Sequence, residues 1–130
     1  MKTGFEDFES LKALAEKGNA DAQCNLGVMY EDGDGVPEDD KEAVKWYRKA
    51  AEQGNHVAQA NLGVMHYEGD GVPEDFAIAY AWLNIAAANG IANAKTNKGI
   101  IAKLMTPDQI AEGQKLTREM IKKNPKLLNK

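Results

Sequence analysis

The chain has 130 residues, of which 43% are hydrophobic and 28% charged, and its single cysteine cannot form an internal disulfide. This composition excludes a disordered chain and a disulfide-stabilised domain, and no apolar run approaches the roughly 20 residues that span a bilayer. The net charge of −4 argues against a nucleic-acid binder, which usually needs a net basic surface. The first ten residues lack the apolar segment of a signal peptide. We therefore expect a cytoplasmic protein, or a periplasmic or secreted one if a signal peptide has been removed.

Charge is distributed unevenly along the sequence. Residues 1–93 carry 7 basic and 17 acidic side chains, whereas residues 94–130 carry 9 basic and 3 acidic ones. A basic C-terminal part is compatible with an anionic partner, but a solvated helix face more often explains such a run.

The first predicted element is a helix over residues 5–17, and Gly18 ends it. Its last turn, Leu-Ala-Glu-Lys-Gly-Asn at 14–19, resembles Ala-Ala-Glu-Gln-Gly-Asn at 50–55. This helix is therefore interpreted as the second half of a repeat. Its apolar residues have helical spacing: Phe5, Phe8, Leu11, Leu14 and Ala15.

Three further helices, over 21–32, 57–68 and 93–104, share one pattern at an offset of 36 residues. Each has a glycine in its middle: Gly27, Gly63 and Gly99. A mid-helix glycine costs about 1 kcal/mol relative to alanine. Three of them in one register predict that another helix approaches closely at each position.

The seven residues Gly-Asp-Gly-Val-Pro-Glu-Asp occur at 33–39 and again at 69–75. Glycine and proline disfavour a helix interior, so each copy is predicted to be a loop joining two helices. Helices over 39–53 and 75–89 are expected to follow, with Asp39 as the first N-cap and Glu42 completing a capping box. Asp75 is the expected cap of the second. Trp46 and Trp82 share a register in these helices, and packing between helices is favoured over ligand binding.

The last predicted helix begins at Thr106, with Pro107 in its first turn and Gln109 completing a capping box. Asn124 and Pro125 end it. The last few residues of the chain are expected to fray.

A 36-residue period with two helices per unit predicts an all-α helical solenoid. The sequence resembles the Sel-one-like repeat (SLR) family, a relative of the tetratricopeptide repeat. The first copy of the motif supplies Ala22, Leu26, Gly27, Tyr30, Gly33, Gly35, Val36, Pro37, Asp39, Ala43, Trp46, Ala50, Ala51 and Gly54. The second copy supplies the same set, with His66 in place of Tyr30.

The resemblance implies a short right-handed superhelix that serves as an adaptor for other proteins, often in bacteria. The expected division is a half repeat at 5–20, full repeats at 22–57 and 58–93, a further first helix at 94–105 and a capping helix at 106–123. The chain lacks the paired cysteines of the cysteine-rich branch of the family.

Residues for catalysis or metal binding are sparse. The acidic loop after Asp32 fails the ligand spacing of an EF-hand. His56 and His66 are ten residues apart without further ligands, so no metal site is expected. Cys24 has no histidine near it in the sequence, as a catalytic thiol would need. We expect no enzymatic activity and no cofactor.

In solenoids of this type the first helix of each repeat lines a concave groove. Three asparagines, Asn25, Asn61 and Asn97, form a ladder there, and their amides could bond the backbone of an extended peptide or, alternatively, a neighbouring helix or water. Val28, Val64 and Tyr67 are the other predicted contacts. The full set of groove positions is Asp21, Asn25, Val28, Asp32, Val57, Asn61, Val64, Glu68, Asn93, Asn97, Ile100 and Leu104.

The sequence therefore favours a non-enzymatic interaction module that binds a peptide or protein segment in its groove. One alternative is a binder or hydrolase of a small cell-envelope fragment resembling peptidoglycan. Self-association through the repeat ends is another. No nucleic acid and no membrane span is expected.

Overall fold

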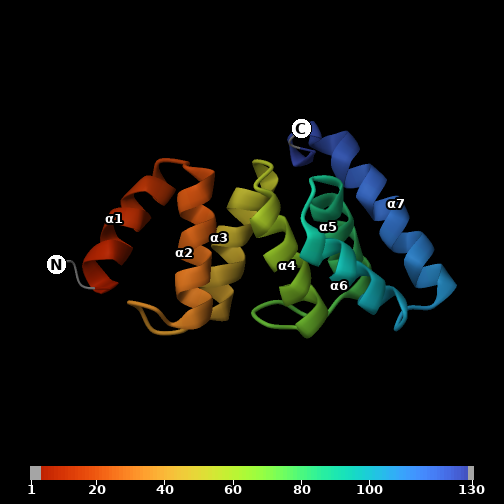
Figure 1. Ribbon diagram of the computed structural model, residues 1–130, viewed down its shortest axis with the longest axis horizontal. Coiled ribbons are helices and arrows are strands. Elements are labelled where there is room, and N and C mark those ends of the chain that lie inside the picture. Colours follow the sequence, from red (N-terminus) through yellow and green to blue (C-terminus); the bar gives the residue numbers. More distant parts are fainter. Residues whose placement is uncertain (1–3, 129–130) are drawn as a thin grey trace.

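The computed structural model describes residues 4–128, with side chains from residue 7 onward. Within this range the chain forms seven α-helices, one short 3₁₀ helix and no strand (Figure 1). Every predicted helix is present, with ends that differ by at most two residues. The Phe5 side chain lies outside the described residues. The elements are α1 (Gly4–Glu16), α2 (Ala20–Asp32), α3 (Asp40–Glu52), α4 (His56–Glu68), α5 (Phe76–Ala88), α6 (Ala92–Ala102), α7 (Pro107–Lys123) and η1 (Pro125–Leu127).

The helices stack as a solenoid, which confirms the predicted fold class. From α1 to α6 each helix packs on the next one along the chain, and α4 also contacts α6. The first helices of the repeats, α2, α4 and α6, form one layer, and α1, α3 and α5 form the other; Figure 1 shows α4 and α6 in front of α5. No helix in the described range has the length and apolar composition to cross a membrane.

The loop between α2 and α3 is closed by backbone hydrogen bonds. Gly33 ends α2 in the left-handed region, with φ 68°. The Asp39 N–H donates to the carbonyl of Tyr30 at 2.9 Å. The Asp39 carboxylate caps α3 as predicted, since it accepts from the Glu42 N–H at 3.1 Å. Glu42 does not complete a capping box, because the Asp39 N–H it would accept from already bonds Tyr30.

Two of the three mid-helix glycines mark close helix contacts, as predicted. A Cβ atom on Gly27 would lie 2.6 Å from ring carbons of Tyr47 on α3. A Cβ atom on Gly63 would lie 2.8 Å from Cγ of Leu83 on α5. Both distances are shorter than any real contact, so only glycine allows each pair of helices to pack at this distance.

The predicted close helix contact at Gly99 was wrong, because nothing lies within 4 Å of a Cβ atom built on this residue. The next helix, α7, packs on α5 instead of α6. Its close contact is made by Gly113, where a Cβ atom would lie 2.7 Å from the Tyr80 ring. In the described part of the chain, no helix therefore lies close to α6 at Gly99, although α5 packs on another part of α6.

The segment after α7 is anchored as far as η1, and the last two residues, for which fraying was also predicted, lie outside the described residues. Helix η1 contacts α3, and the Leu127 side chain is only 3% exposed. The Leu127 carbonyl accepts from Nε2 of Gln59 at 3.0 Å and from Nδ2 of Asn89 at 2.8 Å. Nδ2 of Asn124 donates to the Glu52 carbonyl at 2.8 Å. The C-terminal turn thus joins α3, α4 and the end of α5.

We predict that Gly27→Ala destabilises the protein by about 1–3 kcal/mol, because the added methyl group would overlap the Tyr47 ring. Gly99→Ala, the matched control, should instead be neutral or stabilise by up to about 1 kcal/mol, since it gains helix propensity in open space. Urea denaturation followed by circular dichroism measures both. Equal effects of the two substitutions would contradict the difference in packing.

Leu127→Ala should lower the free energy of unfolding by about 2–5 kcal/mol, the usual cost of truncating a buried leucine. Leu104→Ala is the control, because Leu104 is one of the most exposed apolar side chains, and its effect should be small. A C-terminal turn that contributes nothing to stability would leave both urea midpoints at the native value.

Candidate functional site

The asparagine ladder lies on α2, α4 and α6, as the predicted groove requires. Asn25 is exposed, and Asn61 and Asn97 are half-buried. Among the described residues, none of the three side chains has a hydrogen-bond partner. Their amides are therefore not used to hold one helix to the next.

Large apolar side chains are exposed on the same layer. Val57 is 46% exposed, Ile100 49% and Leu104 57%. In the described part of the chain the only other large hydrophobic residue exposed to this degree is Leu14 on α1, at 49%. Three of these four side chains thus occupy predicted groove positions.

A small pocket of about 80 Å³ lies between α4 and α6. It brings together three predicted contacts, Val64, Tyr67 and Asn97. The Tyr67 ring is fixed by Phe76, whose ring centroid is 5.5 Å away. The volume suits one small aliphatic side chain. The complete lining is Val64, Tyr67, Glu68, Asn97, Ile100 and Ile101.

A second pocket, of about 280 Å³, lies at the N-terminal ends of α2 and α4. Asn25 lines it beside Val57. Nδ2 of Asn55 donates to Oδ1 of Asp21 at 2.9 Å across this region and ties the start of α4 to α2. The two remaining predicted contacts, Asn61 and Val28, line neither of these two pockets. Four of the six predicted contacts therefore line two separate pockets on one layer.

The groove is acidic at the C-terminal ends of α2 and α4. The pKa of Glu68 is raised above its usual range, chiefly by a side-chain hydrogen bond with Asp70. Burial and the charges of Asp70, Glu31 and Asp40 raise it further. Because Asp70, Glu31 and Asp40 place negative charge around Glu68, a cationic group would be stabilised at this end of the groove.

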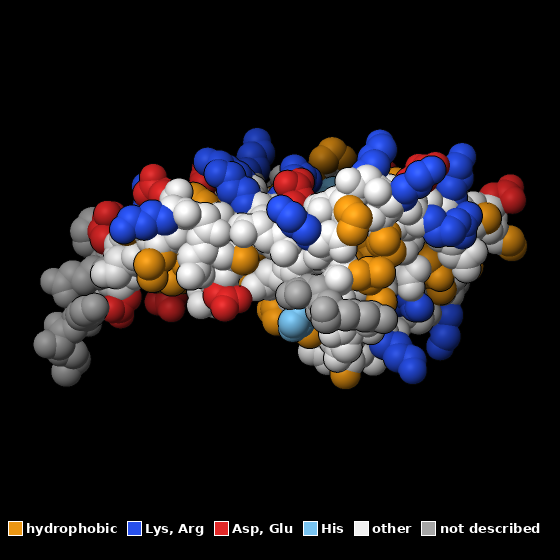
Figure 2. All heavy atoms as spheres, turned by 90° about the horizontal axis from the view of Figure 1, so that it is seen from above, with side chains coloured by type: hydrophobic (Ala, Val, Ile, Leu, Met, Phe, Trp, Pro, Cys, Tyr) orange, Lys and Arg blue, Asp and Glu red, His pale blue; other side chains and the backbone are white. Residues whose placement is uncertain are grey.

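The uneven charge of the sequence persists in space. In Figure 2, where the molecule is seen from above, Lys and Arg side chains follow the upper edge and are also frequent toward the right-hand end, while most visible acids lie toward the N-terminal end.

Cys24 and the two histidines form no reactive cluster. Burial, together with the charge of Asp21, raises the pKa of Cys24 to about 11, so its thiol is protonated at neutral pH. Burial and the nearby Arg48 lower the pKa of His66, which lies on α4 with His56. The described residues contain no group of three side chains able to hold a metal ion.

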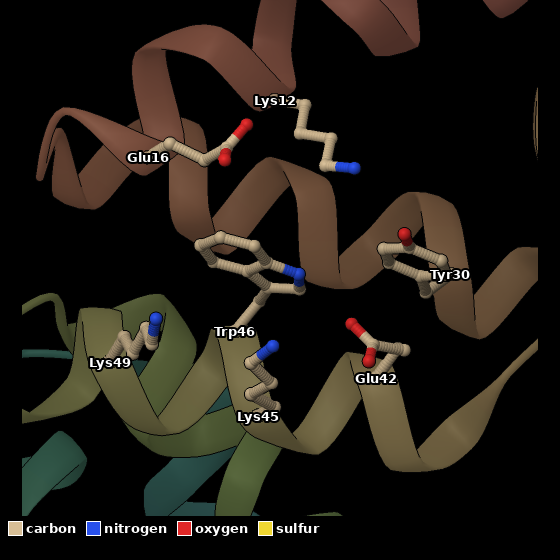
Figure 3. A pocket seen from close by; sticks show the side chains of 7 residues that line it. All are labelled: Lys12, Glu16, Tyr30, Glu42, Lys45, Trp46 and Lys49. Atoms are coloured by element: carbon tan, nitrogen blue, oxygen red, sulfur yellow. The ribbon is translucent and has the colours of Figure 1, made fainter.

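A larger pocket, of about 500 Å³, opens on the other layer between α1 and α3 (Figure 3). At its centre Trp46 is 5% exposed and packs between helices as predicted. Two lysines lie over the indole, with Nζ of Lys49 4.7 Å and Nζ of Lys45 5.5 Å from the ring centroid. The indole Nε1–H is buried without a hydrogen-bond partner. The lining consists of Lys12, Glu16, Tyr30, Glu42, Lys45, Trp46 and Lys49.

This pocket was not found from the sequence, although a signal exists. The residues on the Trp46 face of α3 are charged: Glu42, Lys45 and Lys49. Those at the same register on α5 are apolar: Ile78, Ala81 and Ile85. Since α3 and α5 otherwise match at this register, the change from charged to apolar residues indicates that the Trp46 face of α3 is exposed to solvent and the equivalent face of α5 is covered.

The sequence analysis also overlooked a buried pair of amides that holds the first repeat together. Nε2 of Gln23 donates to the Ala15 carbonyl at 3.1 Å, and Oε1 of Gln23 accepts from Nε2 of Gln53 at 2.8 Å. Gln59 repeats this arrangement with Ala51 and Asn89. The structural amides are therefore these residues, not the asparagine ladder.

We predict that iodoacetamide modifies Cys24 at least about a hundredfold more slowly in the folded protein at pH 8 than in concentrated urea, because the reactive thiolate is scarce when the pKa is raised. Mass spectrometry of quenched samples measures the two rates. A folded-state rate equal to the unfolded one would point to an activated, accessible thiol and would revive the hydrolase alternative.

Comparison with known proteins places these features in a family. The Sel1 repeat family matches residues 20–55 and 56–91. A protective antigen of uropathogenic Escherichia coli strains, which displays an SLR fold, aligns with 96% of this chain at 35% identity and a TM-score of 0.90. A Sel1 repeat protein from Oxalobacter formigenes aligns with 77% of it at 38% identity and a TM-score of 0.73.

The chain spans 27% of the length of the first of these structures and 41% of the second. A comparison with curated proteins gave no match. The repeats matched by the family cover more than half of the chain, and both structural relatives share the fold at more than 30% identity. The chain therefore belongs to the Sel1 repeat family, whose members are generally protein–protein interaction modules and typically non-enzymatic scaffolds.

Proposed function

We propose that the chain binds an extended segment of a protein partner in the groove along α2, α4 and α6, and catalyses no reaction on it. The observation that carries this proposal is the exposure of Val57, Ile100 and Leu104 at groove positions. These apolar side chains lie on the layer that carries the asparagine ladder.

The asparagine side chains supply the polar part of the recognition. An amide both donates and accepts, so it can pair with the N–H and C=O groups of an extended backbone. Asn25, Asn61 and Asn97 have no hydrogen-bond partner among the described residues, so they can make these bonds without breaking the fold.

Side-chain preference would come from the small pocket and the charge beside it. The pocket formed by Val64, Tyr67 and Asn97 accepts one aliphatic side chain, and the Tyr67 ring supplies an anchor. Glu68 lines the same pocket and lies in the acidic end of the groove. The preferred segment therefore has an aliphatic residue followed or preceded by a basic one.

The binding or hydrolysis of a cell-envelope fragment is less well supported. A hydrolase needs a nucleophile next to a base. The described groove positions are amides, aliphatic side chains and acids, and the neighbouring Cys24 has a raised pKa. We therefore assign the groove to binding.

Peptide display on the native protein, followed by NMR titration of the selected peptides, tests this assignment. Selected peptides should carry an aliphatic residue next to a basic one. They should also shift the side-chain amide signals of Asn25, Asn61 and Asn97. A triple variant with these three residues changed to Asp should bind the peptides about tenfold or more weakly, because each carboxylate loses the donors of the amide.

The matched control places three new carboxylates on other helices, with Ser10→Asp, Ala111→Asp and Gln114→Asp. It carries the same added charge and should bind like the native protein. Circular dichroism confirms that both variants are folded. If no peptide is selected, or both triple variants bind equally well, the groove is not the peptide site.

A further inference from the structure

The second layer of the solenoid contains two equivalent clefts. One of them is partly filled by the chain itself, and a pocket of about 310 Å³ remains there beside Trp82 and Leu127. Trp46 on α3 and Trp82 on α5 are 36 residues apart and occupy the same register. The C-terminal turn lies in the cleft between α3 and α5, where Leu127 joins Trp82 in one buried cluster. The equivalent cleft between α1 and α3 is the open pocket of about 500 Å³ over Trp46.

The filled cleft shows what kind of segment fits. Leu127 supplies a buried side chain, and its carbonyl is an acceptor for two side-chain amides, those of Gln59 and Asn89. Asn124 bonds the last carbonyl of α3, that of Glu52. A short turn of the form Asn-Pro-x-Leu-Leu is therefore compatible with a cleft of this shape.

The open cleft requires an acceptor. The Trp46 side chain is 95% buried, and its Nε1–H has no hydrogen-bond partner among the described residues. Figure 3 shows the indole nitrogen directed toward the space between Lys12, Tyr30 and Glu42. Since an indole N–H only donates, the partner that it lacks would be an acceptor such as an oxygen atom. Lys12 carries a flexible side chain at this opening and can move aside.

The charges of the open cleft decide between two possible occupants, a segment of another protein and the C-terminal turn of a second copy of this chain. The open cleft carries Lys12, Lys45 and Lys49 against Glu16 and Glu42, and no Lys–Glu ion pair is formed among these described side chains.

The chain's own C-terminal turn is itself basic, with Lys122, Lys123 and Lys126. Insertion of this turn from a second copy would bring like charges together. A segment with the same shape and acidic side chains would be attracted.

We propose that the pocket over Trp46 is a second docking site, which takes an acidic, leucine-containing turn of a protein partner. A leucine of the partner enters the cleft beside the Trp46 side chain, and a carboxylate of the partner lies among the three lysines. This site is on the layer opposite the groove, so the chain can hold two segments at once.

The test uses two synthetic peptides and the full chain. The acidic probe is acetylated Asn-Pro-Glu-Leu-Leu-Glu, and the control is Asn-Pro-Lys-Leu-Leu-Lys, which repeats the charge of the chain's own turn. The two indole N–H signals in a ¹H–¹⁵N spectrum report the two clefts separately. The acidic peptide should shift the Trp46 signal saturably and leave the Trp82 signal in place, and the basic peptide should shift neither.

Variants locate the binding. Lys49→Glu should weaken binding of the acidic peptide about tenfold or more, because it reverses a charge beside the indole. Lys103→Glu, at the exposed end of α6, should leave binding unchanged. The triple asparagine variant of the groove should also bind the acidic peptide normally, which separates this site from the proposed groove.

Three results would overturn the proposal. These are the absence of a saturable Trp46 shift at millimolar acidic peptide, an equal shift with the basic peptide, and an equal shift with inorganic phosphate alone. The last result would mean that the pocket binds small anions and not a peptide turn.

Discussion

The close approach of neighbouring helices at mid-helix glycines determines the geometry on which the rest of the structure depends. At Gly27 and Gly63 the second-layer helix lies so near that a methyl group would overlap Tyr47 or Leu83. This contact sets the distance between the two layers in each repeat. The two layers then present separate surfaces. On each surface, equivalent side chains recur at the same 36-residue period.

The two surfaces differ in charge and in chemistry. The first-layer groove combines unpartnered amides and exposed aliphatic side chains with an acidic end near Glu68. The second-layer pocket combines Trp46 with three lysines. The two proposed sites lie on different faces, so binding at one would not compete with binding at the other.

The helices, loops and caps could be predicted from the sequence because they depend on neighbouring residues. Asp39 caps its helix and Gly33 ends the preceding one through contacts within a few residues. The glycine register predicted two close contacts correctly, since those depend on the adjacent helix of the same repeat. It failed at Gly99, because the path of α7 onto α5 is decided by packing between distant segments.

The candidate site was less predictable for the same reason. The residues of the groove layer follow from the period, so Val64 and Asn97 could be placed on it in advance. Tyr67 was selected because it departs from the period, with Glu31 at the matching position of the preceding repeat. The pocket over Trp46 exists because no described segment of the chain fills the cleft between α1 and α3, and such an absence has no sequence motif of its own. Only a comparison of α3 with α5 at the charged and apolar positions could have indicated it.

The C-terminal turn also changes how the solenoid can unfold. In a repeat array each unit contacts only its neighbours, so helices at an end can detach one at a time. Here the carbonyl of Leu127 bonds Gln59, a residue 68 positions earlier in the chain. This bond closes a large loop that contains α5, α6 and α7. The C-terminal half must therefore open as one cooperative unit, whereas α1 is free to detach alone from the other end.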